Sequence, residues 1–261
     1  RIESGRIAVE LLTSTDDETA HHLGQTINEH NNERKNIDRE ITQEALEMVN
    51  SGNCLSAANA TIVYNPSWHK GVVGIVASRL VEAFYRPTIV LTKSNGFVTG
   101  SARSVHGLDL YEAIESCADL LENFGGHLYA AGLTMKEENL PEFCQRIEKA
   151  IEGKISPVML TPIVDLDAKL DFAQITPKFF RILKQFQPFG PGNPKPIFYT
   201  HRVFDYNGAS KIVGRDNEHL KLELTDESSE NVMNGIAFRM AEYSQDLKAF
   251  NPLDIVYTLE D

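Results

Sequence analysis

The pattern of apolar residues changes at Gly153, and this change constrains the fold more than any other feature of the sequence. Between residues 60 and 152, strand-like runs alternate with segments of helical periodicity. After Gly153 come short β patterns and a rigid connection rich in Pro and Gly, FQPFGPGNPKP at 186–196. The chain therefore predicts an α/β domain with a mixed sheet, followed by a small all-β domain. The five short strands expected after this connection suggest a closed barrel of the OB type.

The expected elements follow from periodicity and from turn signals such as Asn95-Gly96, which is typical of a two-residue hairpin. In the first domain we expect strands at 60–64, 88–92, 97–101 and 127–134, and helices at 71–84, 109–124 and 139–152. In the second we expect strands at 162–169, 197–206, 209–213, 219–225, 232–238 and 253–259, with helices at 175–186 and 241–248.

A long helix is expected ahead of the α/β domain. A capping box at 15–18 predicts its start, and apolar residues at spacings of three and four carry it to about Asn50. Arg34 lies on the apolar face of this helix. A buried guanidinium is costly unless it is paired, so Arg34 needs an anion. The partner is either a neighbouring carboxylate or the phosphate of a ligand.

The segment TGSARSVHG at 99–107 is the first candidate site. Ser101 can donate a hydroxyl hydrogen bond, and Arg103 can donate two parallel ones to a phosphate. Glycines on both sides allow close approach, and the start of the helix expected at 109 favours an anion. These features predict a pocket for a terminal phosphate; the alternative is a polar turn with an exposed arginine.

The second candidate is FGGHLYAAG at 124–132. Gly125 and Gly126 leave the backbone next to His127 open to a bulky ligand. The imidazole of His127 could contact a phosphate or a base, or it could simply pack in the fold.

Composition sets further limits. The net charge of −12 excludes a chain whose whole surface attracts nucleic acid, but it allows a local basic site. No apolar run could span a bilayer and no signal peptide is seen, so we expect a cytoplasmic protein. Three widely spaced cysteines predict buried thiols, and no metal-binding constellation is visible in the sequence.

Several motifs, taken in order, closely resemble the C-terminal half of the RecJ family of single-stranded-DNA-specific 5′-to-3′ exonucleases. They are WHKGVVGIVASRL, RPTIVLT, GSARS, LLENFGGHLYAAGLTM, FQPFGPGNPKPIF and HLKLEL. The resemblance implies a DHHA1 domain at 55–155 and a linker with a C-terminally truncated OB-like domain at 156–261. Residues 1–54 would be the end of a DHH lobe and the connecting helix. The Asp-His-His motif that carries Mn²⁺ or Mg²⁺ in the intact enzyme is not present, so we expect this chain alone to be inactive and to bind no metal.

The resemblance also implies roles for individual residues. His127 would be catalytic, lying beside the scissile phosphate. The residues that would hold the 5′ phosphate are Arg34, Ser101, Arg103, Gly125 and Gly126. In the barrel, aromatic faces and positive charge suit single-stranded DNA. The residues offered there are Phe204, Tyr206, Lys211, Arg215 and Lys221.

Two other functions stay open on the sequence. GGH together with GSARS is shared with small-oligonucleotide or cyclic-dinucleotide phosphodiesterases of the DHHA1 type, although the C-terminal barrel would then have no purpose. The chain could also be a non-catalytic module that binds single-stranded DNA through the barrel.

Overall fold

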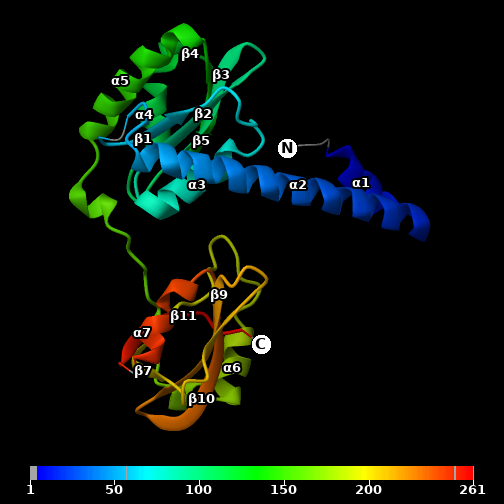
Figure 1. Ribbon diagram of the computed structural model, residues 1–261, viewed down its shortest axis with the longest axis vertical. Coiled ribbons are helices and arrows are strands. Elements are labelled where there is room, and N and C mark those ends of the chain that lie inside the picture. The colour runs from blue at the N-terminus through cyan, green and yellow to red at the C-terminus, as the bar shows by residue number, and fades with distance from the viewer. Residues whose placement is uncertain (1–4, 57, 250, 261) are drawn as a thin grey trace. The chain divides into compact units, whose positions relative to one another are not determined.

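The computed structural model describes residues 5–56, 58–249 and 251–260. The chain divides into two compact units, the first ending at Pro162 and the second starting at Ile163 (Figure 1). Each unit has a sheet and a hydrophobic core of its own. The predicted α/β organisation with two sheets and a long N-terminal helix is confirmed.

The long helix α2 spans Asp17–Asn50 and follows a short helix, α1 (Arg6–Thr13), that was not predicted. The cap of α2 is Asp16, whose Oδ2 accepts a hydrogen bond from the backbone N–H of Thr19 at 2.8 Å. The expected capping box at 15–18 therefore lies one residue too early. A carboxylate at this position satisfies a free amide and also suits the positive end of the helix dipole.

The first unit contains a five-stranded mixed sheet in the order β1-β2-β3-β5-β4. Strands β1 and β2 are parallel, and the other neighbours are antiparallel. The Asn95-Gly96 hairpin joins β2 to β3 as predicted, with positive φ angles at both residues. The strands are β1 (Thr61–Tyr64), β2 (Thr88–Ser94), β3 (Phe97–Arg103), β4 (Leu121–His127) and β5 (Ala130–Met135).

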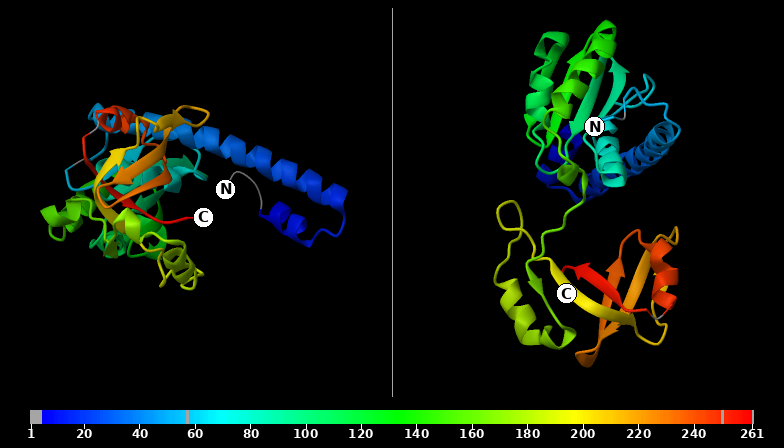
Figure 2. Two further views of the ribbon diagram at one scale, coloured as in Figure 1. Left: turned by 90° about the horizontal axis from the view of Figure 1, so that it is seen from below. Right: turned by 90° about the vertical axis from the view of Figure 1, so that its left-hand side faces the viewer.

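Helices cover both faces of this sheet, which gives three layers (Figure 2, right). On one face, α2 and α3 (Val73–Phe84) share a cluster that includes Ile41, Val76 and Val90. On the other, α4 (Leu110–Glu115) and α5 (Leu140–Glu152) pack on side chains such as Leu133. Alternation along each strand thus sends successive residues into different cores.

The sequence prediction was wrong between 109 and 127. Instead of one helix reaching Phe124, α4 stops at Glu115, a 3₁₀ turn spans Ala118–Leu120, and Leu121–His127 form strand β4. The GGH segment is therefore part of a hairpin with β5. Pairing with β5 supplies the backbone hydrogen bonds of this strand, and two adjacent glycines weaken a helix at the same place.

The second unit has a sheet in the order β10-β9-β7-β11, with β6 beside β7 and β8 beside β9. The expected closed barrel is wrong, because β10 and β11 end the sheet and do not pair in the described residues. Strand β6 has two residues and β8 has three, too short to bridge the edges. The elements are β6 (Ala168–Lys169), α6 (Pro177–Lys184), β7 (Phe198–Asp205), β8 (Lys211–Val213), β9 (His219–Asp226), β10 (Ser229–Ala237), α7 (Ser244–Lys248) and β11 (Leu253–Tyr257). Short 3₁₀ turns at Glu137–Asn139, Pro157–Leu160, Phe172–Gln174 and Ala241–Tyr243 complete the secondary structure of the described chain.

Candidate functional site

Ser101 and Arg103 are two residues apart on β3, so their side chains lie on the same face of the sheet. Arg103 Nη1 donates to Ser101 Oγ and to the carbonyl oxygen of Ala102, each at 2.8 Å. One nitrogen of the guanidinium is thereby fixed. The Ser101 oxygen acts as the acceptor in this bond, so its own proton is left for another acceptor.

Arg103 is a half-buried cation, and none of the described carboxylates lies beside it. Within the described part of the chain, Arg103 forms no ion pair, and Nη2 and Nε have no hydrogen-bond acceptor. Burial lowers the pKa of the Arg103 guanidinium, because the charged form is partly desolvated. A buried charge without a protein counter-ion is what a binding site for an anion requires.

The first turn of helix α3 borders this pair of side chains. A Cβ atom built on Gly74 would lie 3.0 Å from Arg103 Nη2 and 3.1 Å from Ser101 Oγ. The positive end of the α3 dipole therefore adds to the positive potential around the guanidinium. The sequence predicted the start of the next helix, α4, for this role, but there Asp109 already accepts the backbone N–H of Glu112 at 3.0 Å.

Strand register places the two sequence motifs side by side. In the sheet, Arg103 is paired with Ala130, and Ala130 is paired with His127. Residues paired in this way point to the same face, and two strand spacings separate Arg103 and His127 by about 10 Å between Cα atoms. Both residues were predicted as site residues from separate sequence motifs, which did not indicate that they lie on one face. The antiparallel order β3-β5-β4 brings them together.

Between Ser101 and the edge strand, the same face has a floor of glycine. Ser101 is paired with Gly132, and Gly132 with Gly125. Both glycines are exposed, and a Cβ atom on Gly125 would meet no atom within 4 Å. A ligand can therefore rest directly on the backbone here, with the guanidinium on one side and the exposed His127 on the other.

Gly126 has a different position. It is paired with Ala131, which is buried in the core on the α4–α5 side, so Gly126 lies on the opposite face from Gly125. A Cβ atom on Gly126 would lie 2.2 Å from the carbonyl oxygen of Ala130 and 2.6 Å from Ala131 Cα. The close approach of the two backbones explains this glycine.

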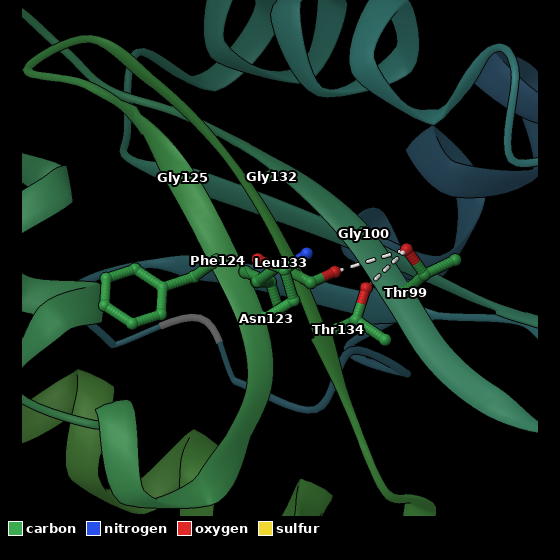
Figure 3. A pocket seen from close by; sticks show the side chains of 8 residues that line it. All are labelled: Thr99, Gly100, Asn123, Phe124, Gly125, Gly132, Leu133 and Thr134. Atoms are coloured by element: carbon green, nitrogen blue, oxygen red, sulfur yellow. Dashed lines mark hydrogen bonds between the residues drawn. The ribbon is translucent and has the colours of Figure 1, made fainter.

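A shallow hollow of about 340 Å³ continues along the face from the glycine floor (Figure 3). One further register row crosses it, formed by Thr99, Thr134 and Asn123. The hydroxyls of Thr99 and Thr134 lie 3.3 Å apart, and Thr99 Oγ1 also donates to the carbonyl oxygen of Leu133. This row was not predicted from the sequence, although alternation from Ser101 to Thr99 could have suggested its first member.

Arg34 lies on α2 and is half-buried. Its Nη2 donates to Asn31 Oδ1 at 3.0 Å. Neither a carboxylate partner nor a hydrogen bond to Ser101 or Arg103 is found for it among the residues that the structure describes. One turn further on, Asp38 pairs with Arg79 of α3 at 2.6 Å, which fixes this part of α2 on the α/β domain.

In the second unit, three of the five nominated residues share the outer face of the sheet. Lys211 is paired with Lys221, and Phe204 is paired with Thr225, four residues along β9 from Lys221. Tyr206 follows the end of β7 and Arg215 lies in the β8–β9 loop, and both are exposed.

The same outer face contains an aromatic pair that was not predicted from the sequence. Phe238 directly follows β10, is 70% exposed, and contacts the ring of His219 edge-on with 5.3 Å between centroids. Ile236, paired with Lys221, is also exposed. An apolar and aromatic strip thus runs beside the two lysines. Isolated aromatic residues at strand ends gave no signal in the sequence.

No group of three or more His, Cys, Asp or Glu residues that could hold a metal ion exists among the described residues. Likewise, none of the helices described here combines the length and apolarity needed to cross a membrane.

Comparison with known proteins defines the class. Residues 57–153 match the DHHA1 domain model, and residues 166–261 match the RecJ OB domain model. The two matches leave out the first 56 residues and the short segment 154–165. The chain thus contains a DHHA1 domain followed by an OB domain. The second model is specific to RecJ and the relatives bear the same name, so the chain is similar to the part of RecJ proteins that contains these two domains.

The single-stranded-DNA-specific exonuclease RecJ of Bacillus subtilis is 34% identical over 259 residues, which is 98% of this chain and 32% of the relative. RecJ of Escherichia coli is 32% identical over 250 residues, 92% of this chain and 42% of that protein. The chain therefore spans less than half the length of these relatives.

Among solved structures, Thermus thermophilus RecJ with Mg²⁺ superposes with a TM-score of 0.69 at 24% identity, covering 98% of this chain and 41% of that one. A manganese-bound exonuclease RecJ superposes with a TM-score of 0.53 at 30% identity, covering 60% of this chain and 39% of that one. The first of these likenesses concerns the fold alone.

Proposed function

We propose that this chain is the substrate-binding portion of a single-stranded-DNA-specific 5′-to-3′ exonuclease. The observation that carries the proposal is the half-buried Arg103 guanidinium, which has free donors and no carboxylate partner among the described residues. It lies beside an open sheet face in register with His127. Such a cation suits a phosphate ester, and the glycine floor suits the nucleotide attached to it. The names of the relatives supply the class of substrate.

In this proposal the 5′ phosphate receives hydrogen bonds from Arg103 Nη2 and from the Ser101 hydroxyl. Arg34 completes the phosphate site from α2, where it has no carboxylate partner within the described chain. His127 lies beside the next phosphodiester, separated from Arg103 by the width of the glycine floor. Gly125 allows the strand to approach, and Gly126 allows the hairpin that presents His127.

Bond cleavage in the intact enzyme is proposed to use Mn²⁺ or Mg²⁺, the ions named for the similar RecJ structures. The described residues offer no cluster that fits either ion. We therefore assign the metal ligands to a DHH lobe elsewhere in the same polypeptide, and we route no step of the reaction through a metal in this chain. The part of the present residues is to bind, orient and fix the end of the strand.

The OB domain is proposed to hold the rest of the strand. Lys211 and Lys221 can contact phosphates, and Phe204 lies on the same face. Tyr206 and Arg215 are exposed, and each lies within two residues of the end of a strand of this sheet. A mixture of aromatic surface and positive charge binds single strands with little dependence on sequence.

The test is equilibrium binding of a fluorescent oligothymidylate, with either a phosphate or a hydroxyl at its 5′ end, followed by anisotropy. The phosphorylated strand should bind more tightly, and Arg103→Ala should remove most of that difference. Charge-assisted hydrogen bonds contribute about 1.5–3 kcal/mol, which corresponds to a loss of about tenfold or more. Arg181→Ala is the matched control, because Arg181 is exposed on α6 and outside the proposed phosphate site.

Equal binding of the two oligonucleotides by the unmodified chain would contradict the phosphate site. Loss of binding confined to Lys211 or Lys221 variants would instead indicate a module that binds strands through the OB domain alone. Preference for a cyclic dinucleotide over both oligonucleotides would favour the phosphodiesterase alternative.

A further inference from the structure

The first turn of α3 contains one residue whose type is unexpected for its surroundings. Gly74 is flanked by Val72, Val73, Ile75 and Val76, all of them branched at Cβ. Glycine inside a helix costs about 1 kcal/mol relative to alanine. Its φ angle lies outside the region that favours glycine, so the backbone at this position would also accept alanine.

The reason for the glycine lies across the layer boundary, on β3. A Cβ atom at position 74 would come within 3.0 Å of Arg103 Nη2 and 3.1 Å of Ser101 Oγ, whereas ordinary contacts of a Cβ atom begin near 3.4 Å. Both atoms belong to the side chains assigned above to the 5′ phosphate. The residue one turn further along the same helix face is Ser78, which is also small and whose hydroxyl donates to the carbonyl oxygen of Gly74.

A methyl group at this position would displace the guanidinium before it displaced the helix. Helix α3 is held by the buried side chains of Val73, Val76 and Leu80, while Arg103 is a long side chain fixed by two hydrogen bonds through Nη1. A shift of a few tenths of an ångström moves Nη2 and Ser101 Oγ away from their present relative positions. The two donors would then no longer point to one phosphate group.

We propose that Gly74 is a positioning residue for the phosphate site, where the absence of a side chain lets Arg103 and Ser101 present two donors to one anion. The inference rests on the proposed function. It adds a third element to the site, the first turn of α3, which acts through its shape and carries no functional group. In this role Gly74 contacts neither the DNA strand nor the reacting phosphate.

The test is Gly74→Ala, measured with the two oligonucleotides described above and by urea unfolding. We expect the preference for the 5′ phosphate to fall about tenfold, while binding of the 5′-hydroxyl strand stays unchanged. Stability should stay the same or rise, because alanine is the better helix former. A merely structural glycine would give the opposite result, with lower stability and an unchanged preference for the phosphate.

The matched control is Gly24→Ala in α2, since a Cβ atom there would meet no atom within 4 Å. This variant should keep the phosphate preference in full. A double-variant cycle gives a second measurement: in an Arg103→Ala background, Gly74→Ala should have no further effect on the preference, because no guanidinium is left to displace.

The outcomes separate the two proposals. If the unmodified chain prefers the 5′ phosphate and Arg103→Ala removes this preference but Gly74→Ala keeps it, the inference about Gly74 is wrong and the phosphate site stands. A marked loss of stability in Gly74→Ala would show that the added methyl group disturbs the packing of α3 and not the guanidinium of Arg103. This result would also overturn the inference. If the unmodified chain has no preference, both proposals are refuted together.

Discussion

Replacing Asp38 by alanine tests how α2 is held on the DHHA1 domain. Asp38 is 2% exposed, its Oδ2 accepts Arg79 Nη2 at 2.6 Å, and its Oδ1 accepts the hydroxyl of Thr42. Removing one member of a buried ion pair costs about 3–5 kcal/mol when the remaining charge stays buried. The Arg79 side chain is 32% exposed, so water can solvate it in part. We therefore expect a loss of about 2–3 kcal/mol in the free energy of unfolding.

The assay can be confined to this part of the molecule. Trp68 is the single tryptophan of the sequence, is buried beside α2, and its Nε1 donates to Glu44 Oε2 at 2.7 Å. Urea unfolding followed by tryptophan fluorescence therefore reports on the docking of α2. Glu40→Ala is the matched control, an exposed carboxylate two residues away on the same helix, and it should change stability by less than about 0.5 kcal/mol. If both variants unfold at the same urea concentration as the unmodified chain, the ion pair does not fix α2 and the reasoning fails.

Further predictions concern three separate parts of the chain. Gly126→Ala should destabilise the protein by about 3 kcal/mol or more, because its Cβ atom would overlap the backbone of β5. Gly125→Ala should leave thermal unfolding unchanged and weaken oligonucleotide binding. Equal stabilities of the two variants would contradict the assignment of Gly126 to backbone packing and of Gly125 to the open face. Burial raises the pKa of the Cys144 thiol to about 11, so the native protein should resist alkylation at Cys144 near neutral pH while the less buried Cys54 reacts, as peptide mass spectrometry would detect. The Cys144 thiol ionises near pH 9.0 in the unfolded chain and near pH 11 in the folded one, so unfolding releases a proton between these pH values. In urea titrations the contribution of Cys144 to the free energy of unfolding should therefore fall as the pH rises from 9 to 11. A contribution that rises with pH would refute the burial of this thiol. Phe238→Ala should weaken binding of both oligonucleotides about equally, by roughly tenfold for one lost stacking contact. A loss restricted to the 5′-phosphorylated oligonucleotide would contradict DNA binding on the outer face of the OB domain.

Local signals in the sequence were sufficient for many elements. The periodicity through Ile41 and Ala45 predicted α2, and Asn95-Gly96 predicted the turn between β2 and β3. These features depend on residues within one or two turns of each other, so they can be read without the rest of the chain. The nomination of Ser101, Arg103 and His127 also needed no more than residue chemistry and spacing, together with the family resemblance. Their roles are still proposals.

Where local signals competed with pairing across the sheet, the sequence misled. The segment from Asp109 to Phe124 has helical spacing, but hydrogen bonding to β5 makes its last residues a strand. The closed barrel failed for a related reason: closure depends on whether the edge strands meet, and no property of a single strand records this.

The sequence by itself determined many of the helices and strands, the change from an α/β pattern to a β pattern after Gly153, and the residue types able to bind a phosphate. The tertiary structure decided which of the residues able to bind a phosphate share one face of the sheet. Antiparallel register sets Arg103 in a row with His127, puts Gly125 on the open face and Gly126 against a backbone, and brings Gly74 of α3 to the guanidinium. The physical reason is that side-chain chemistry is a property of each residue, whereas convergence depends on strand order and layer packing, which are fixed by contacts between residues far apart in the chain.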